Sequence, residues 1–154
     1  MKFTTTEDLE APVDAVFRAV ADFSVYQRMG ERNGVRIERT DRLPQPAAGS
    51  SWAADFRYRG KERSAVAELE AFDPPNGLTM RVRSAGIGGV IQADLTELAA
   101  SRTRIRIDME LEPQSITAKL LVQSLRLARG RAEERYRTRI HRFLREVEAR
   151  LQRA

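Results

Sequence analysis

The chain has 154 residues, 42% of them hydrophobic, with one histidine and no cysteine. This size and composition predict a single domain, residues 1–154, with enough apolar side chains for one core. The missing cysteines exclude disulfides and thiolate metal sites, and the lone His141 argues against a His-rich metal site or a Ser-His-Asp triad. We therefore expect no metal and no cofactor. The N-terminus lacks the apolar run of a signal peptide and no stretch is long enough to span a bilayer, which predicts a cytoplasmic protein.

The net charge of +5 is concentrated at the C-terminal end of the chain. From Thr117 onward there are 11 Lys and Arg against 4 Asp and Glu, a balance of +7, whereas the preceding residues hold 16 against 18, a balance of −2. One interpretation is a solvated helix face, and the other is a surface for an anionic partner such as a membrane or RNA. No aromatic residues interleave with these arginines, which argues against nucleic-acid stacking.

The first part of the chain is predicted to form a strand and two short helices. Residues 2–9 are rich in Thr, which is typical of a strand. Pro12 is well placed for the first turn of a helix, and apolar residues at positions 13, 16, 17 and 20 have the spacing of one buried face. A second short helix is expected over residues 23–29.

Six strands are then expected in succession, which makes seven in all. Apolar and polar residues alternate over residues 35–41, 51–58, 62–72, 78–82, 91–95 and 103–111, and turn-forming residues separate these stretches. Within residues 62–72, Ala65, Ala67, Leu69 and Ala71 are predicted to share one face. Successive strands joined by short turns pair antiparallel, and one charged face per strand indicates a sheet that is wet on one side and covered on the other.

The longest predicted element is a helix from Ile116 to Gln152. Its apolar residues recur at steps of mostly three and four, and most of its arginines fall on the opposite side. Gly130 is a candidate kink, with residues 117–129 as a movable cover and residues 132–151 as the half fixed to the core. The sequence thus predicts an α+β fold in which a curved seven-stranded antiparallel sheet wraps around a long C-terminal helix, in the order β-α-α-β6-α.

Two segments carry a family resemblance. The segment Ala11-Pro12-Val13-Asp14-Ala15-Val16-Phe17, followed by Asp22-Phe23 and Tyr26, resembles the SRPBCC superfamily, the START/Bet v 1-like helix-grip group, and the polyketide cyclase/dehydrase-like branch is closest. The stretch from Glu70 to Leu78 is similar to the turn between the fourth and fifth strands of that group. The chain departs from the pattern at Arg28-Met29, where a Trp is usual. The resemblance implies a cavity between sheet and helix for lipids, polyketides or other small hydrophobic molecules.

Small residues on the predicted inner face agree with such a cavity, because alanines do not fill the space that a curved sheet leaves. The alternative is that larger side chains fill it. The side chains expected to bind a ligand are Trp52, Phe56, Tyr58, Ala67, Leu69, Met80, Ala93, Met109, Leu121, Leu125 and Arg129.

The sequence leaves three functions open. The first is binding or transport of a small hydrophobic ligand such as a lipid, polyketide or quinone-like molecule. The second is a cyclase or aromatase, in which Tyr58 or Arg129 would polarise the substrate. Arg129 shares a helix face with Tyr136, so it points either into the cavity mouth or out to solvent. The third is an interaction module that contacts an anionic surface through the basic C-terminal helix.

Overall fold

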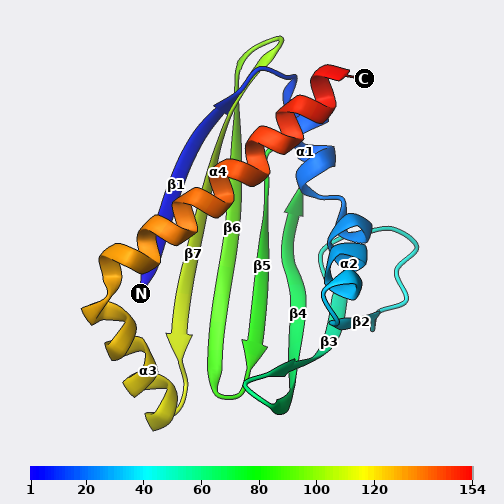
Figure 1. Cartoon of the computed structure of the whole chain (residues 1–154). Coiled ribbons are helices and arrows are strands. Elements are labelled where there is room, and N and C mark those ends of the chain that lie inside the picture. Colours follow the sequence, from blue (N-terminus) through cyan, green and yellow to red (C-terminus); the bar gives the residue numbers. More distant parts are fainter. Residues whose placement is uncertain (154) are drawn as a thin grey trace.

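The computed structural model describes residues 1–153 and confirms the α+β fold. Four helices and seven strands follow one another along these residues (Figure 1). In chain order they are β1 (Lys2–Leu9), α1 (Val13–Val20), α2 (Phe23–Arg32), β2 (Arg36–Arg39), β3 (Ser51–Tyr58), β4 (Lys61–Asp73), β5 (Gly77–Ser84), β6 (Ile87–Ala99), β7 (Arg102–Pro113), α3 (Ile116–Leu127) and α4 (Arg129–Arg153).

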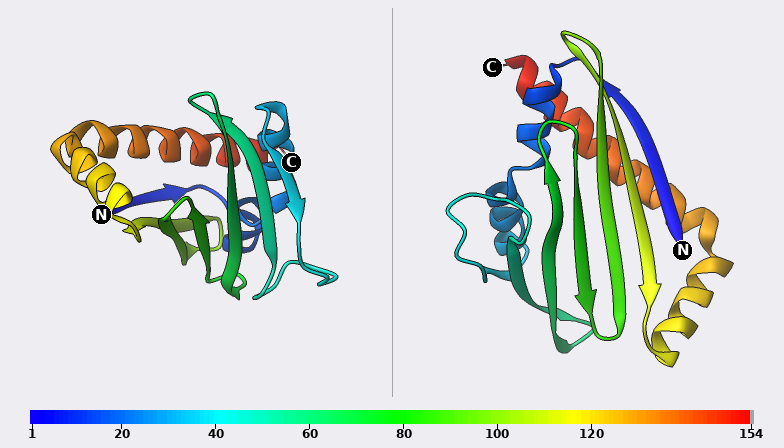
Figure 2. Two further views of the ribbon diagram at one scale, coloured as in Figure 1. Left: turned by 90° about the horizontal axis from the view of Figure 1, so that it is seen from below. Right: turned by 180° about the vertical axis from the view of Figure 1, so that it is seen from behind.

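The seven strands form one antiparallel sheet in the order β1-β7-β6-β5-β4-β3-β2. The sheet is strongly curved, and its concave side faces α4 (Figure 2). Helices α1 and α2 follow β1 and lead the chain across to β2 at the far edge (Figure 1). The predicted curved sheet with a helix across it is therefore confirmed.

The sheet and α4 are held together by the apolar faces that the sequence pattern predicts. Along β7, Ile105 and Ile107 are buried while Arg104 and Arg106 are exposed. On α4, Tyr136, Leu144 and Val147 are buried. The hydroxyl of Tyr136 donates a 2.6 Å hydrogen bond to the carbonyl of Ile107, which fixes the helix to β7, the strand next to the edge strand β1.

The prediction of one continuous helix over residues 116–152 is wrong in one respect, because this segment forms two helices that meet at Ala128. This residue leaves helical geometry, with φ −106° and ψ 25°, two positions before the expected kink at Gly130. The two halves point in different directions, and α3 turns away from α4 beside the end of β7 (Figures 1 and 2). Only Ala118 and Val122 of α3 are buried. Most of the helical cover over the concave face of the sheet therefore comes from α4.

The prediction that Ala71 shares the inward face of β4 is also wrong. The register with β5 shifts between Leu69 and Ala71, a β-bulge that adds one residue to β4. As a result Ala71 is exposed, and Phe72 turns inward to pack against Phe17 with ring centroids 5.4 Å apart. Simple alternation fails here because a bulge reverses the faces of all residues that follow it.

Candidate functional site: an apolar cavity under α2 and α4

A cavity of about 480 Å³ lies between the concave face of the sheet and the helices α2 and α4. This volume is within the range of sites for small organic molecules. The residues that line it come from nine elements or their ends: Val20, Phe23, Tyr26, Gln27, Ile37, Trp52, Ala54, Ala65, Ala67, Leu78, Met80, Val82, Ile91, Ala93, Ile107, Ile140 and Phe143. The lining is almost entirely apolar, so the cavity favours an apolar occupant.

Aromatic rings gather along one side of this cavity, and alanines line part of the sheet. Aromatic rings form one wall, where Phe23 packs against Trp52 at 5.0 Å and Tyr26 against Phe143 at 5.9 Å between centroids. The sheet side carries alanines, and pairing across β3 and β4 places Ala54 opposite Ala65. Because alanine side chains end at Cβ, this part of the sheet leaves open space above it.

Every described side chain that lines the cavity is uncharged. The hydroxyl of Tyr26 donates a 2.6 Å hydrogen bond to the carbonyl of Val20. Burial raises the pKa of Tyr26 far above its ordinary value, so this phenol stays protonated at neutral pH. The amide nitrogen of Gln27 donates to the carbonyl of Ile37 at 3.3 Å. The amide oxygen of Gln27 accepts no hydrogen bond from the described part of the chain, which leaves it available to a ligand hydroxyl.

Four of the eleven predicted ligand-binding residues line the cavity: Trp52, Ala67, Met80 and Ala93. The other seven do not. Phe56 and Met109 are half-buried outside the lining, and Leu69 is fully buried in the core. Tyr58, 54% exposed, lies at the end of β3 with the guanidinium groups of Arg59 and Arg63 over its ring.

The remaining three predicted residues follow the broken helix away from the cavity. Leu121 is exposed and Leu125 is half-buried on α3, and neither lines the cavity. Arg129 is exposed at the start of α4, where its side chain approaches Glu133 at 4.0 Å and the carbonyl of Lys2 at 3.5 Å. Neither Tyr58 nor Arg129, the two side chains considered for catalysis, reaches the cavity.

Thirteen residues that line the cavity are absent from the predicted ligand set, six of them on helices and seven on strands. Ile140 and Phe143 share the apolar face of α4 with Tyr136, so helical periodicity could have identified them. The sequence placed the cavity under the first half of a continuous helix instead. Tyr26 and Gln27 lie about one turn after Phe23 on α2, and only the packing of α2 onto the sheet shows that these residues face a cavity.

Behind the cavity, an ion pair supports Trp52 from the loop side. The guanidinium of Arg39 lies 5.8 Å from the centre of the Trp52 ring and contacts Asp41 at 2.8 Å. The backbone N–H of Ser51 also donates to Asp41. The hydrogen bonds from Arg39 and then from Ser51 hold the pKa of Asp41 well below its ordinary value.

This pKa predicts a pH dependence of folding. Because the folded-state pKa of Asp41 is lowered, its stabilising effect is present above the ordinary pKa of 3.8 and is lost as the pH falls toward the folded value. We expect Asp41→Asn to reduce the acid dependence of the free energy of unfolding below about pH 4, measured by denaturant titration at several pH values. Asp55→Asn is the matched control, because Asp55 is exposed on β3 and makes no ion pair among the described residues. Equal acid dependence in the wild type and Asp41→Asn would contradict this account.

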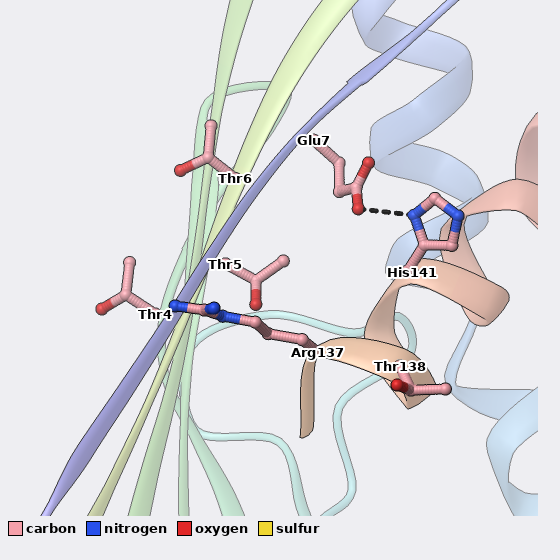
Figure 3. A pocket seen from close by; sticks show the side chains of 7 residues that line it. All are labelled: Thr4, Thr5, Thr6, Glu7, Arg137, Thr138 and His141. Carbon is pink, nitrogen blue, oxygen red and sulfur yellow. Dashed lines mark hydrogen bonds and ion pairs between the residues drawn. The ribbon is translucent and has the colours of Figure 1, made fainter. Parts of the chain in front are cut away.

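A second groove, of about 530 Å³, lies between β1 and α4 and has a different character (Figure 3). It is open and polar, and its lining is Thr4, Thr5, Thr6, Glu7, Arg137, Thr138 and His141. Glu7 points from β1 toward α4, where its carboxylate lies 2.7 Å from Nδ1 of His141 and 3.3 Å from Arg145 (Figure 3 shows the first contact). Arg145 also donates to the carbonyl of Asp8 at 2.7 Å. These contacts fasten the edge strand to the helix.

The Glu7 cluster therefore predicts a stability effect. Glu7→Gln removes the charge that Arg145 and His141 share, and we expect the free energy of unfolding to fall by about 1 to 2 kcal/mol. Glu134→Gln, on the exposed side of α4 and outside every ion pair of the described residues, should change it by less than about 0.5 kcal/mol. Thermal and denaturant unfolding measure the change in the free energy of unfolding for both variants. Equal small effects would show that the cluster does not stabilise the β1–α4 contact.

Two further properties bear on the class of protein. Among residues 1–153, no group of three or more His, Cys, Asp or Glu is arranged to hold a metal ion. No helix in the same range has the length and apolar character needed to cross a membrane.

The fold and the cavity together define a helix-grip protein of the SRPBCC superfamily. Residues 1–150 match the model of the family described as polyketide cyclase / dehydrase and lipid transport, and the chain belongs to this family. None of the curated proteins matches this sequence.

Solved structures show the same fold at low sequence identity. The chain is similar to the Zhui aromatase/cyclase from Streptomyces sp. R1128, with a TM-score of 0.67, 14% identity, and coverage of 98% of this chain and 95% of that one. It is similar to Ara h 8.0201, with a TM-score of 0.63, 10% identity, and coverage of 100% and 99%. It is also similar to TTHA0849 from Thermus thermophilus, with a TM-score of 0.60, 18% identity, and coverage of 99% and 97%. At these identities the likeness concerns the fold.

Proposed function

We propose that the protein binds a small, uncharged, hydrophobic molecule in the cavity under α2 and α4. The observation that carries this proposal is a cavity of about 480 Å³ lined by uncharged, almost entirely apolar side chains. Burial of apolar surface contributes roughly 25 cal/mol per Å², so shape and burial supply the affinity. Membership of a family described as polyketide cyclase / dehydrase and lipid transport supports the same ligand class.

The polar groups of the cavity suit orientation of a ligand better than acid–base chemistry. Tyr26 stays protonated and its proton is already engaged by a backbone carbonyl, while Gln27 offers an amide that does not titrate. A charged ligand group buried here would find no opposite charge among the lining side chains and would carry a large desolvation cost. We therefore favour binding or transport over catalysis as the function.

Titration with Nile red, a neutral dye whose fluorescence rises in apolar surroundings, tests this proposal. The dye should bind saturably at one site, and neutral apolar molecules such as dodecanol or a quinone should displace it and be recovered unchanged. A polyol of similar size should not displace it. Failure of the dye to saturate, or equal displacement by the polyol, would contradict the proposal. Conversion of a displaced compound would instead assign catalysis to the cavity.

A further inference from the structure

Helix α3 carries apolar side chains that the rest of the described structure leaves uncovered. Ile116 is 79% exposed, Leu120 60% and Leu127 93%. Single exposed apolar residues are ordinary, but a helix that exposes several of them together marks an interaction surface. Ala118 and Val122 are the only buried residues of α3, and Leu125 is half-buried.

Ile116, Leu120 and Leu127 lie on one face of the helix, whereas the fourth exposed apolar residue, Leu121, lies about 140° from Ile116 around the axis. At 100° per residue, Leu120 and Leu127 fall within about 40° of Ile116 around the helix axis. Lys119 and Arg126 lie next to this stripe, displaced by about 60° to 80° on the same side of it. An apolar stripe bordered by long basic side chains is the pattern of a helix that lies in a membrane interface, because the cationic ends reach the headgroups while the leucines enter the acyl boundary.

The charged residues of α3 and of the sequence just after it all have one sign. No acidic residue occurs between Glu112 and Glu133, whereas this interval contains Lys119, Arg126, Arg129 and Arg131. A second copy of the chain docked through the same face would place these like charges opposite one another. An anionic lipid surface can bury the apolar stripe and also attract the positive charge.

We propose that α3 docks the protein on anionic membranes, with Ile116, Leu120 and Leu127 in the acyl boundary and the neighbouring basic residues at the headgroups. The position of α3 suits this role, because it projects from the fold beyond the start of α4, at the end opposite the β6–β7 hairpin (Figure 1). This inference goes beyond ligand binding in the cavity and does not depend on it.

Cosedimentation with vesicles tests the proposal. The wild type should bind vesicles made of equal parts phosphatidylglycerol and phosphatidylcholine, bind phosphatidylcholine vesicles far more weakly, and lose affinity as the salt concentration rises. Leu127→Asp should weaken binding to the anionic vesicles by about tenfold or more, because it removes an inserted apolar side chain and adds a negative charge. Since Leu127 is almost fully exposed, this variant should fold normally, as circular dichroism will show.

Leu98→Asp is the matched control, because Leu98 is 40% exposed at the end of β6, at the opposite end of the molecule. It should bind vesicles like the wild type. The proposal is overturned if the wild type does not bind anionic vesicles, or if Leu127→Asp and Leu98→Asp bind equally well. A dimer that Leu127→Asp dissociates would assign the face to a second copy, and binding of RNA but not vesicles would assign it to nucleic acid. Leu127→Asp should retain Nile red binding, so failure of docking is distinguishable from failure of the cavity proposal.

Discussion

Replacing Ala67 by Phe is expected to weaken Nile red binding by about tenfold or more. Ala67 lies on β4 in the wall of the cavity, where it pairs across the sheet with Trp52 and Val82. A phenyl ring at this position occupies space that a ligand needs, and a loss of about 1.4 kcal/mol in binding already corresponds to tenfold in affinity. The fold has room for the ring, so the free energy of unfolding should change by less than about 1.5 kcal/mol.

Ala53→Phe provides the matched control for this substitution. Ala53 is next to Trp52 on β3, but it pairs with the exposed Val66 and belongs to the outer face of the sheet. The same change in size on that face should leave dye affinity within about twofold of the wild type. Fluorescence titration of both variants measures the difference. Equal affinities for the two variants would show that the dye binds outside the cavity.

Leu144→Ala is expected to have the largest effect on stability, lowering the free energy of unfolding by about 3 kcal/mol. Leu144 is fully buried in the middle of α4, so truncation loses its burial and leaves a void beneath the helix. The same substitution at Leu127, which is 93% exposed on α3, should change stability by less than about 0.5 kcal/mol.

Denaturant unfolding of the two alanine variants measures this contrast directly. A large loss at Leu144 with none at Leu127 is expected because α4 is the half of the C-terminal segment that packs on the core. Comparable losses at both positions would mean that α3 also packs against the protein in solution. That result would also remove the exposed stripe on which membrane docking depends.

The sheet was predictable from sequence because its pattern is local. The alternation of apolar and charged residues along β7 involves only residues that are neighbours in the sequence, and Arg104 and Arg106, which alternate with Ile105 and Ile107, are indeed exposed. The same alternation identified Ala67 and Met80 as inward-facing, and both line the cavity. It failed at Ala71 because the bulge that reverses the faces depends on pairing with β5.

The helical side of the site was less predictable because it depends on tertiary contacts. The apolar residues on both sides of Ala128 satisfy one helical period, so the pattern did not show an end at Ala128, although Gly130 indicated a kink two residues further on. That break takes Leu121 away from the cavity and leaves Ile140 and Phe143 over it. Tyr26 lies in the cavity wall because of the way α2 packs, with its ring against Phe23 and Phe143.

Native mass spectrometry of the freshly purified protein shows whether the cavity under α2 and α4 holds a ligand. The wild type is predicted to carry an additional small apolar molecule at near-stoichiometric level, and release and identification of that molecule would name the ligand class. Ala67→Phe, purified in parallel, is predicted to lack it. The same unliganded mass in both proteins, or the same adduct on both, would contradict the claim that the cavity under α2 and α4 is a binding site.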